Sequence, residues 1–470
     1  MTTTKNIIIS VLMLAACGSG QKRVAETGLG GNKAPPPPTA FGGEVKSEAA
    51  EPKRELSKDA KSDFQDAVDY YTQQDKAGWN ESSCKTAADK FDSVANEHKL
   101  VEARYMVGRS YHNCNMKGDA ERAYQAALAM KSNYGAAMSA LGELYYEDGK
   151  VDAAKDYWQN AIKANPKLVG ARNDIASLDL EEMRKVGPND PHWKDLEADA
   201  RNNLSSVLAV DNDNVKAYVL YGLVYLEGRQ KNKNRLDLAK LLLDEGAKRN
   251  EKYAPLENAR GLYFLFRNNL TEALQHFGKA VELDPNFAEA RMNVGLITLG
   301  FRKYDVAKDQ FQHVLDLKSK DDEFDATIGL GIAQRGLGDL DGAEASYKQA
   351  MKVDSKRGES FYNLGVLYKD FRAAKQSDLK ASQQAYMTAR DYFKQFLDKT
   401  GSDADKAEAK DNIADCDKVI KQLDDFMKNM ANQPPPPPPA PAGSGSGAGS
   451  AGGSGAGSGS GSGADAPKTP

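Results

Sequence analysis

Imidazole and thiol side chains carry much of the metal and nucleophilic chemistry of proteins, and this chain has few of them. It contains 5 histidines and 4 cysteines in 470 residues. No two histidines have the short spacing that pairs metal ligands on one element; they are His98, His112, His192, His276 and His313. The sequence therefore predicts no metal site, no cofactor and no catalytic residue.

The glycine-rich segment Gly329–Gly336 is the other candidate for chemistry, because glycine loops can hold phosphate groups. Its glycines miss the dinucleotide-binding spacing, and no strand pattern precedes them. Acidic pairs are common on solvated helix faces and none is diagnostic. We predict that the protein is not an enzyme, that it has no small-molecule substrate, and that these glycines serve the fold.

Charge and hydropathy narrow the class of partner. The chain has 63 cationic and 67 anionic side chains, and 40% of its residues are hydrophobic. This near balance gives no reason to expect nucleic acid as a ligand. After the first residues there is no second long apolar run, so the body of the chain is predicted to be soluble.

Cys17 has a sequence context of its own. Met1–Lys5 carries one cation, Ile7–Leu14 is mostly apolar, and Leu14-Ala15-Ala16-Cys17 follows. The apolar run is shorter than the roughly 20 residues that span a membrane, so residues 1–16 are predicted to be a cleaved export signal. An ordinary signal peptide cut after Ala16 is the alternative.

These four residues resemble the lipobox of bacterial lipoproteins. The resemblance implies that Cys17 is acylated, with palmitate among the expected chains, and becomes the mature N-terminus. Gly18 after the cysteine implies the outer membrane, with the body of the protein in the periplasm. Two or more acyl chains anchor a protein stably, so Cys17 is the predicted lipidation site and membrane contact.

One residue template recurs through most of the chain at an offset of 119 residues. Gly142, Tyr145, Ala154, Trp158, Ala161 and Pro166 are matched by Gly261, Phe264, Ala273, Phe277, Ala280 and Pro285. The offset equals three periods of about 34 residues plus insertions of about 12 and about 5 residues. We place these insertions near Val186–Trp193 and Arg229–Arg235, in the turns between helices.

The period and its small, aromatic and proline positions resemble the tetratricopeptide (TPR) repeat. The resemblance implies an all-α, right-handed superhelical solenoid of helix pairs in which small residues allow close approach. Nine units can be aligned: Ala60–Leu100, Val101–Tyr134, Gly135–Leu168, Val169–Asn214, Val215–Tyr253, Ala254–Phe287, Ala288–Asp321, Phe324–Arg357 and Gly358–Ser402.

The sequence thus divides into an array with a segment of different composition on each side. The array covers residues 57–402, and residues 403–430 are predicted to form a capping helix with Glu408 and its charged neighbours facing outward. Residues 17–56, with Pro35–Pro38, are predicted to be a disordered leash behind the lipidated N-terminus. Residues 431–470, with Pro434–Pro439 and a Gly/Ser tract, are predicted to be a disordered tail.

Cys84 and Cys114 lie in neighbouring helices of the first two units and should reach the same edge of the array. An exported protein enters an oxidising compartment, so a disulfide between them is one hypothesis. Two separate buried thiols are the alternative, and the sequence does not decide between them. Cys416 has no evident mate and is expected to be buried in the capping helix.

In a TPR array the first helices line a concave groove at about their second, fifth, ninth and twelfth positions. In the central units these positions form an apolar stripe that suits an amphipathic helix or extended peptide of a partner protein. The predicted groove residues are Val219, Leu223, Leu226, Leu262, Leu265, Met292, Leu296 and Leu299. Tighter packing within the chain is the alternative.

The sequence offers two other candidate surfaces. The N-terminal units place Tyr105, Arg109, His112, Glu143 and Tyr146 at groove positions, which are polar or aromatic. The Lys and Asn positions of a clamp for acidic C-terminal tails are absent, so that ligand is disfavoured. The basic loop Arg229–Arg235, beside the loop that ends at Trp193, is predicted to be either solvated or a contact for an acidic partner.

The lipobox, the proline-bearing leash, the nine units and the tail together resemble the TPR outer-membrane lipoprotein of the myxobacterial gliding-motility complex. The resemblance implies a membrane-tethered scaffold that binds other envelope proteins. Two alternatives stay open: a pilotin-like or outer-membrane-protein assembly factor, and a regulator of peptidoglycan synthesis.

Overall fold

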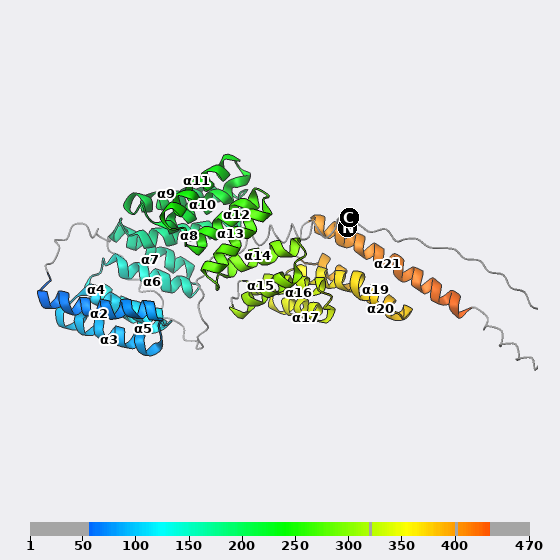
Figure 1. Ribbon diagram of the computed structural model, residues 1–470, viewed down its shortest axis with the longest axis horizontal. Helices are drawn as coiled ribbons and strands as arrows, with labels where there is room; N and C mark the ends of the chain where they lie inside the picture. Colours follow the sequence, from blue (N-terminus) through cyan, green and yellow to red (C-terminus); the bar gives the residue numbers. More distant parts are fainter. Residues whose placement is uncertain (1–55, 319–321, 400–402, 433–470) are drawn as a thin grey trace, which may run out of the picture.

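The computed structural model describes residues 56–318, 322–399 and 403–432. These ranges contain helices and no strand, and successive helix pairs follow one another along the long axis of the molecule (Figure 1). The predicted all-α TPR solenoid is confirmed. The predicted signal peptide, Cys17, the leash up to residue 55 and the tail from residue 433 lie outside the described residues.

The nine predicted units each form two antiparallel helices. The first helices of the units are α2 (Lys58–Ala77), α4 (Val101–Asn113), α6 (Gly135–Glu147), α8 (Val169–Val186), α10 (Val215–Glu227), α12 (Ala254–Phe266), α14 (Ala288–Gly300), α16 (Glu323–Gly336) and α18 (Glu359–Val366). The second helices are α3 (Glu81–His98), α5 (Lys117–Met130), α7 (Val151–Ala164), α9 (Trp193–Val210), α11 (Asn234–Arg249), α13 (Leu270–Leu283), α15 (Tyr304–Asp316), α17 (Leu340–Val353) and α20 (Leu379–Leu397).

In seven of the nine units the helices approach closely because a glycine of the first helix faces a large side chain of the second. A Cβ atom added to Gly142 would lie 2.5 Å from the Trp158 ring, and one added to Gly261 would clash with the Phe277 ring. The alanine four residues before the large side chain is fully buried in all nine units: Ala87, Ala120, Ala154, Ala200, Ala239, Ala273, Ala307, Ala343 and Ala389. Gly329, Gly331 and Gly336 also face aromatic rings, as predicted for glycines that serve the fold.

The helix ends follow the sequence signals. α7 ends at Ala164, two residues before Pro166, and α13 ends at Leu283, two residues before Pro285. The turn between α6 and α7 passes through Gly149 at φ 75°, a backbone conformation that glycine adopts without steric cost. These two helix ends and this turn therefore lie at positions that the sequence marks.

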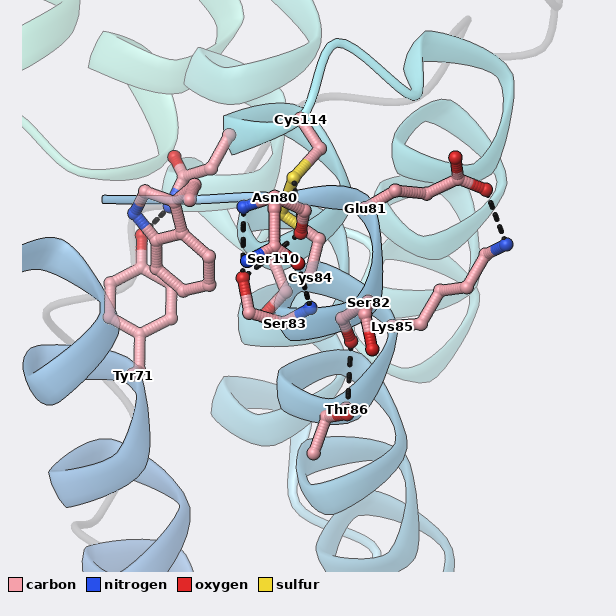
Figure 2. Close-up of a disulfide and its surroundings, with 12 residues drawn as sticks. Tyr71, Asn80, Glu81, Ser82, Ser83, Cys84, Lys85, Thr86, Ser110 and Cys114 are labelled. Atoms are coloured by element: carbon pink, nitrogen blue, oxygen red, sulfur yellow. Dashed lines mark hydrogen bonds and ion pairs between the residues drawn. A yellow bond between two sulfur atoms is a disulfide. The ribbon is translucent and has the colours of Figure 1, made fainter. Parts of the chain in front are cut away.

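A disulfide joins Cys84 of α3 to Cys114 at the end of α4, with their Cα atoms 6.3 Å apart (Figure 2). Of the two arrangements that the sequence left open, the structure has the bridge and not two separate thiols. Asn80 and Ser83 cap the start of α3 with reciprocal hydrogen bonds of 3.0 Å, which fix the turn that presents Cys84. A bridge that closes 30 residues stabilises the folded chain by about 3–4 kcal/mol in the chain-entropy account. Cys416 is a free, buried cysteine of α21, as expected.

The longer insertion differs from its prediction. It lengthens α8 and α9 to 18 residues each, and leaves only a short turn between them. No helix breaker occurs in α8 before Gly187, where the chain turns at φ 75°. Trp193 begins α9 and is 1% exposed, so this side chain belongs to the core and not to a loop surface.

The ninth unit also contains an element that the repeat pattern does not predict. Its first helix, α18, continues as a π-helical segment, η3 (Leu367–Arg372), and a short helix α19 (Ala373–Lys375). Beyond α20, the capping helix α21 (Asp403–Ala431) packs along α20 and leads away from the array (Figure 1). π-Segments occur preferentially at functional sites, which directs attention to this end of the array.

The glycine contact can be tested within a single unit. Gly261→Ala should lower the unfolding midpoint, with a cost of about 1–3 kcal/mol, because the methyl group meets the Phe277 ring. Gly278→Ala in α13 is the matched control: a Cβ atom there meets nothing within 4 Å, so helix propensity should stabilise it by about 0.5–1 kcal/mol. Urea unfolding followed by circular dichroism measures both, and equal shifts would contradict the contact.

Candidate interaction groove

Six of the eight predicted groove residues are buried within the chain itself. Val219, Leu226 and Leu262 join one core cluster, and Met292, Leu296 and Leu299 join the next, all with at most 6% exposure. Leu223 and Leu265 are half-buried. Intramolecular packing thus accounts for most of this stripe, and a role of the eight residues in partner binding stays a prediction.

The polar groove positions of the N-terminal units pair with one another across successive first helices. Arg109 donates to Glu143 at 3.1 Å, and His112 lies 3.1 Å from Glu147. Tyr146 donates to Glu181 in the same way. The partners are 34 or 35 residues apart, so they occupy equivalent places in adjacent units. This spacing was a signal in the sequence for pairs between repeats.

The cations of the basic loop have partners within the chain as well. Arg229 lies over the Phe266 ring at 3.6 Å, and Lys231 lies over the Trp193 ring at 4.2 Å. Arg235 donates to both carboxylate oxygens of Glu197. Among the described residues, Lys231 and Arg235 of this loop therefore contact the fourth unit, and Arg229 contacts the sixth.

The C-terminal end of the array has a hollow of about 510 Å³. It is bounded by α14, α16, the α18–η3 segment and α21, which takes the place of a further first helix. Its residues are Leu296, Leu299, Tyr304, Ile332, Arg335, Gly336, Tyr362, Asn363, Val366, Lys369, Asp370, Phe371, Glu408, Asp411, Asn412 and Asp415. We call this hollow the C-terminal cavity.

Two of the predicted groove residues, Leu296 and Leu299, line this cavity. The other six lie outside it. Sequence analysis did not identify Tyr362, Val366 and Lys369, although they occupy the fifth, ninth and twelfth positions of the ninth unit. The groove positions used for the central units would have identified these three residues if they had been applied to the ninth unit. No pattern in the sequence indicated that α21 would supply residues to the cavity lining.

Hydrogen bonds hold α21 against the cavity. Tyr362 donates to Glu408 at 2.8 Å, and Lys369 donates to Asn412 at 2.6 Å and to Asp415 at 3.1 Å. Burial and the bond to Glu408 raise the pKa of Tyr362, which keeps its hydroxyl protonated. Glu408 therefore faces the array, and the prediction that it faces outward is wrong, because α21 continues the stack as well as covering it.

Residues 117–173, 258–322 and 296–358 match the family described as tetratricopeptide repeat. These ranges include both copies of the template in which a glycine meets an aromatic ring, Gly142 with Trp158 and Gly261 with Phe277. Within these residues the chain carries tetratricopeptide repeats. Proteins of this fold are typically interaction scaffolds without catalysis.

The TPR chain is similar to two curated proteins. It is 25% identical over 212 residues to the Protein O-mannosyl-transferase TMTC1 of Homo sapiens, which covers 45% of this chain and 22% of that protein. It is 23% identical over 149 residues to an uncharacterized protein of Haemophilus influenzae, which covers 32% of this chain and 80% of that protein. The chain thus spans about a fifth of the length of the first relative.

Solved structures similar to the TPR chain include a human IFIT1 dimer with m7Gppp-AAAA, at 16% identity and a TM-score of 0.47, covering 78% of this chain and 81% of that one. Another is the thermophilic TPR protein TTC0263 of Thermus thermophilus, at 22% identity and a TM-score of 0.35, covering 44% and 98%. Within the described residues, no helix combines the length and the apolar character needed to cross a membrane.

Two groups outside the cavity have the residue types of chemistry. Asp63, Glu97 and His98 bring their ligand atoms within 4.8 Å of one another at the surface of the first unit, where His98 and Asp63 are 2.8 Å apart. Asp179 of α8 is 1% exposed, and burial raises its pKa to about 7. Asp179 does not line the C-terminal cavity, and its raised pKa reflects its burial in the core.

Asp179 should make the stability of the TPR array depend on pH. Its folded carboxyl keeps a proton up to about pH 7 while the unfolded one ionises near pH 4, so stability falls as the pH rises through this interval. Asp179→Asn removes the titration. We expect this variant to gain about 2–4 kcal/mol over wild type at pH 8, relative to their difference at pH 4.5.

Urea unfolding at the two pH values measures the gain. Asp156→Asn, at an exposed position of α7, is the matched control and should show no pH-dependent difference. If the free energies of unfolding of Asp179→Asn and wild type differ by the same amount at both pH values, the folded protein does not hold a buried, protonated Asp179 carboxyl.

Proposed function

We propose that the protein is a lipid-anchored TPR scaffold that binds other envelope proteins and works as a component of the gliding-motility machinery. The observation that carries the scaffold is the C-terminal cavity, where three first helices and α21 meet around apolar and charged side chains. Such a hollow on a repeat array suits a segment of another protein. The described residues offer no comparable arrangement for catalysis.

The disulfide supports the envelope as the location. Disulfides persist in exported proteins and are rare in the reducing cytosol. The bridge between Cys84 and Cys114 fits the export signal proposed for residues 1–16. Lipid at Cys17 would then tether the array at the outer membrane, with its body in the periplasm and the leash of residues 17–56 as spacer.

The role in gliding motility rests on the resemblance of the lipobox, leash, array and tail. The phenotype of cells that lack the protein distinguishes this role from its two alternatives. A motility scaffold leaves cells with properly made envelopes that do not glide. An assembly factor leaves a pore mislocalised, and a regulator of peptidoglycan synthesis alters cell-wall crosslinking.

Partner binding can be tested with a photo-crosslinking amino acid in living cells. We expect the crosslinking amino acid to capture the same partner when it replaces Asp411 and when it replaces Leu265, because both positions face the inner side of the array. The exposed Lys308 of α15, a second helix, is the control and should capture none of it. Mass spectrometry identifies the adduct. Capture at Lys308 alone, or at none of the three positions, would contradict the groove as a partner site.

Cys17→Ser tests the tether. We expect the variant to move from the outer-membrane fraction to the soluble periplasmic fraction and to stop incorporating labelled palmitate. The chain should keep its Cys84–Cys114 bridge, as measured by thiol trapping without reductant, because export does not depend on lipid. A variant that stays with the membrane, or a wild-type chain whose two cysteines react as free thiols, would disprove the proposed location.

A further inference from the structure

The C-terminal cavity combines an apolar floor with an excess of negative charge. Leu296 and Leu299 of α14 and Ile332 of α16 lie at its base with 2–7% exposure. Four carboxylates and two cations complete its charged lining: Asp370, Glu408, Asp411 and Asp415, with Arg335 and Lys369. The cavity therefore carries a net negative charge beside an apolar surface.

Both cations are already engaged with groups of the array. Lys369 donates to Asn412 and to Asp415, at 2.6 and 3.1 Å. Arg335 donates to Asn363 at 3.3 Å and lies over the Phe371 ring at 5.4 Å. Neither cation approaches Asp370 or Asp411 closely enough to form an ion pair.

Two carboxylates of the lining are left without an ionic partner. Among the described residues, Asp370 of η3 and Asp411 of α21 form neither a hydrogen bond nor an ion pair, whereas Glu408 accepts from Tyr362. Asp370 is exposed at the surface, but the protein around the hollow keeps part of the water from its carboxyl and so raises its pKa; Lys369 and Arg335 act in the opposite direction, and the charge of Asp415 adds to the rise. A carboxylate in such surroundings gains more from a nearby cation than one in open water.

The π-helical segment has a direct part in this arrangement. It contains both Lys369 and Asp370. Lys369 bonds to α21, whereas Asp370 lines the cavity without such a partner. α21 brings Asp411 to the lining of the same hollow. The two unpaired carboxylates thus come from the two elements that distinguish this end of the array from an ordinary repeat.

We propose that the C-terminal cavity binds a basic amphipathic segment of a partner protein. A lysine or arginine of the segment pairs with Asp370 and Asp411, and an apolar side chain beside it packs on Leu296, Leu299 and Ile332. The proposal deepens the scaffold function and rests on it for the existence of a protein partner. An acidic segment is excluded by like-charge repulsion in the same hollow.

The test uses the whole mature chain carrying Cys17→Ser, which keeps it free of lipid. The probe is a fluorescein-labelled peptide of 4 repeats of Lys-Leu-Leu, roughly the length of an anchor helix. Its counterpart has glutamate in place of each lysine. Fluorescence anisotropy gives the Kd, and a benzophenone on the lysine peptide maps the place of contact by mass spectrometry.

We expect the lysine peptide to bind and the glutamate peptide not to bind. Asp370→Asn together with Asp411→Asn should raise the Kd of the lysine peptide about tenfold. The matched control, Asp156→Asn together with Glu282→Gln, removes two exposed carboxylates from second helices and should change the Kd less than twofold. Benzophenone adducts should fall within residues 359–372 and 403–418.

Several outcomes would overturn the proposal: no binding of the lysine peptide, equal weakening by both double variants, equal binding of the glutamate peptide, or adducts elsewhere. Circular dichroism melts of the two double variants confirm that both are folded, since all four substituted side chains are exposed. The measurement uses purified protein. If Cys17 proves not to be lipidated, the peptide-binding result is unaffected. If the peptide does not bind, the proposed tether and location are unaffected.

Discussion

Close contact between the two helices of a unit, made through small residues, is the constraint on which the whole array depends; in seven of the nine units the small residue is a glycine that faces a large side chain. With no Cβ at Gly142 or Gly261, the Trp158 or Phe277 ring lies directly on the facing helix backbone. The two helices of a unit are then held at close distance, and the buried alanine of the second helix closes the joint. Because one unit cannot bury its apolar surface alone, the units stack, and the same close contact recurs along the array.

Units in which this helix contact differs also differ in the structure around it. In the fifth unit the facing side chain is Leu243, whose atoms would lie 2.9 Å from a Cβ at Gly222, so an aliphatic group replaces the ring. This unit and the fourth, with its long α8 and α9, are joined by additional contacts such as Arg235 with Glu197. At the ninth unit Gly365 still faces Phe393, but the helix continues as η3, which moves the following side chains relative to a regular helix.

The fold could be predicted because its determinants are local and periodic: small residues, rings and prolines recur at fixed places in each unit. The same register placed Cys84 and Cys114 at one edge of the array but did not decide whether they are bridged, which the structure shows they are. The accessibility of the groove could not be predicted, because periodicity gives the face of a helix and not the distance to the next one. Leu226 and Met292 are buried for that reason. The η3 segment and the inward side of α21 depend on contacts distant in sequence, such as Tyr362 with Glu408.

The polar groups along the inner side of the array explain why its two ends differ. In the N-terminal half, Arg109 meets Glu143 and His112 meets Glu147, so charges of one unit are neutralised by the next. Burial raises the pKa of Glu147, but its bonds and charges with His112 and Lys117 outweigh burial and leave that pKa lowered. At the C-terminal end, α21 is the last helix among the described residues. Carboxylates that would meet a neighbour in the middle of the array are left facing a hollow, and the termination of the stack itself creates a site for a partner's cation.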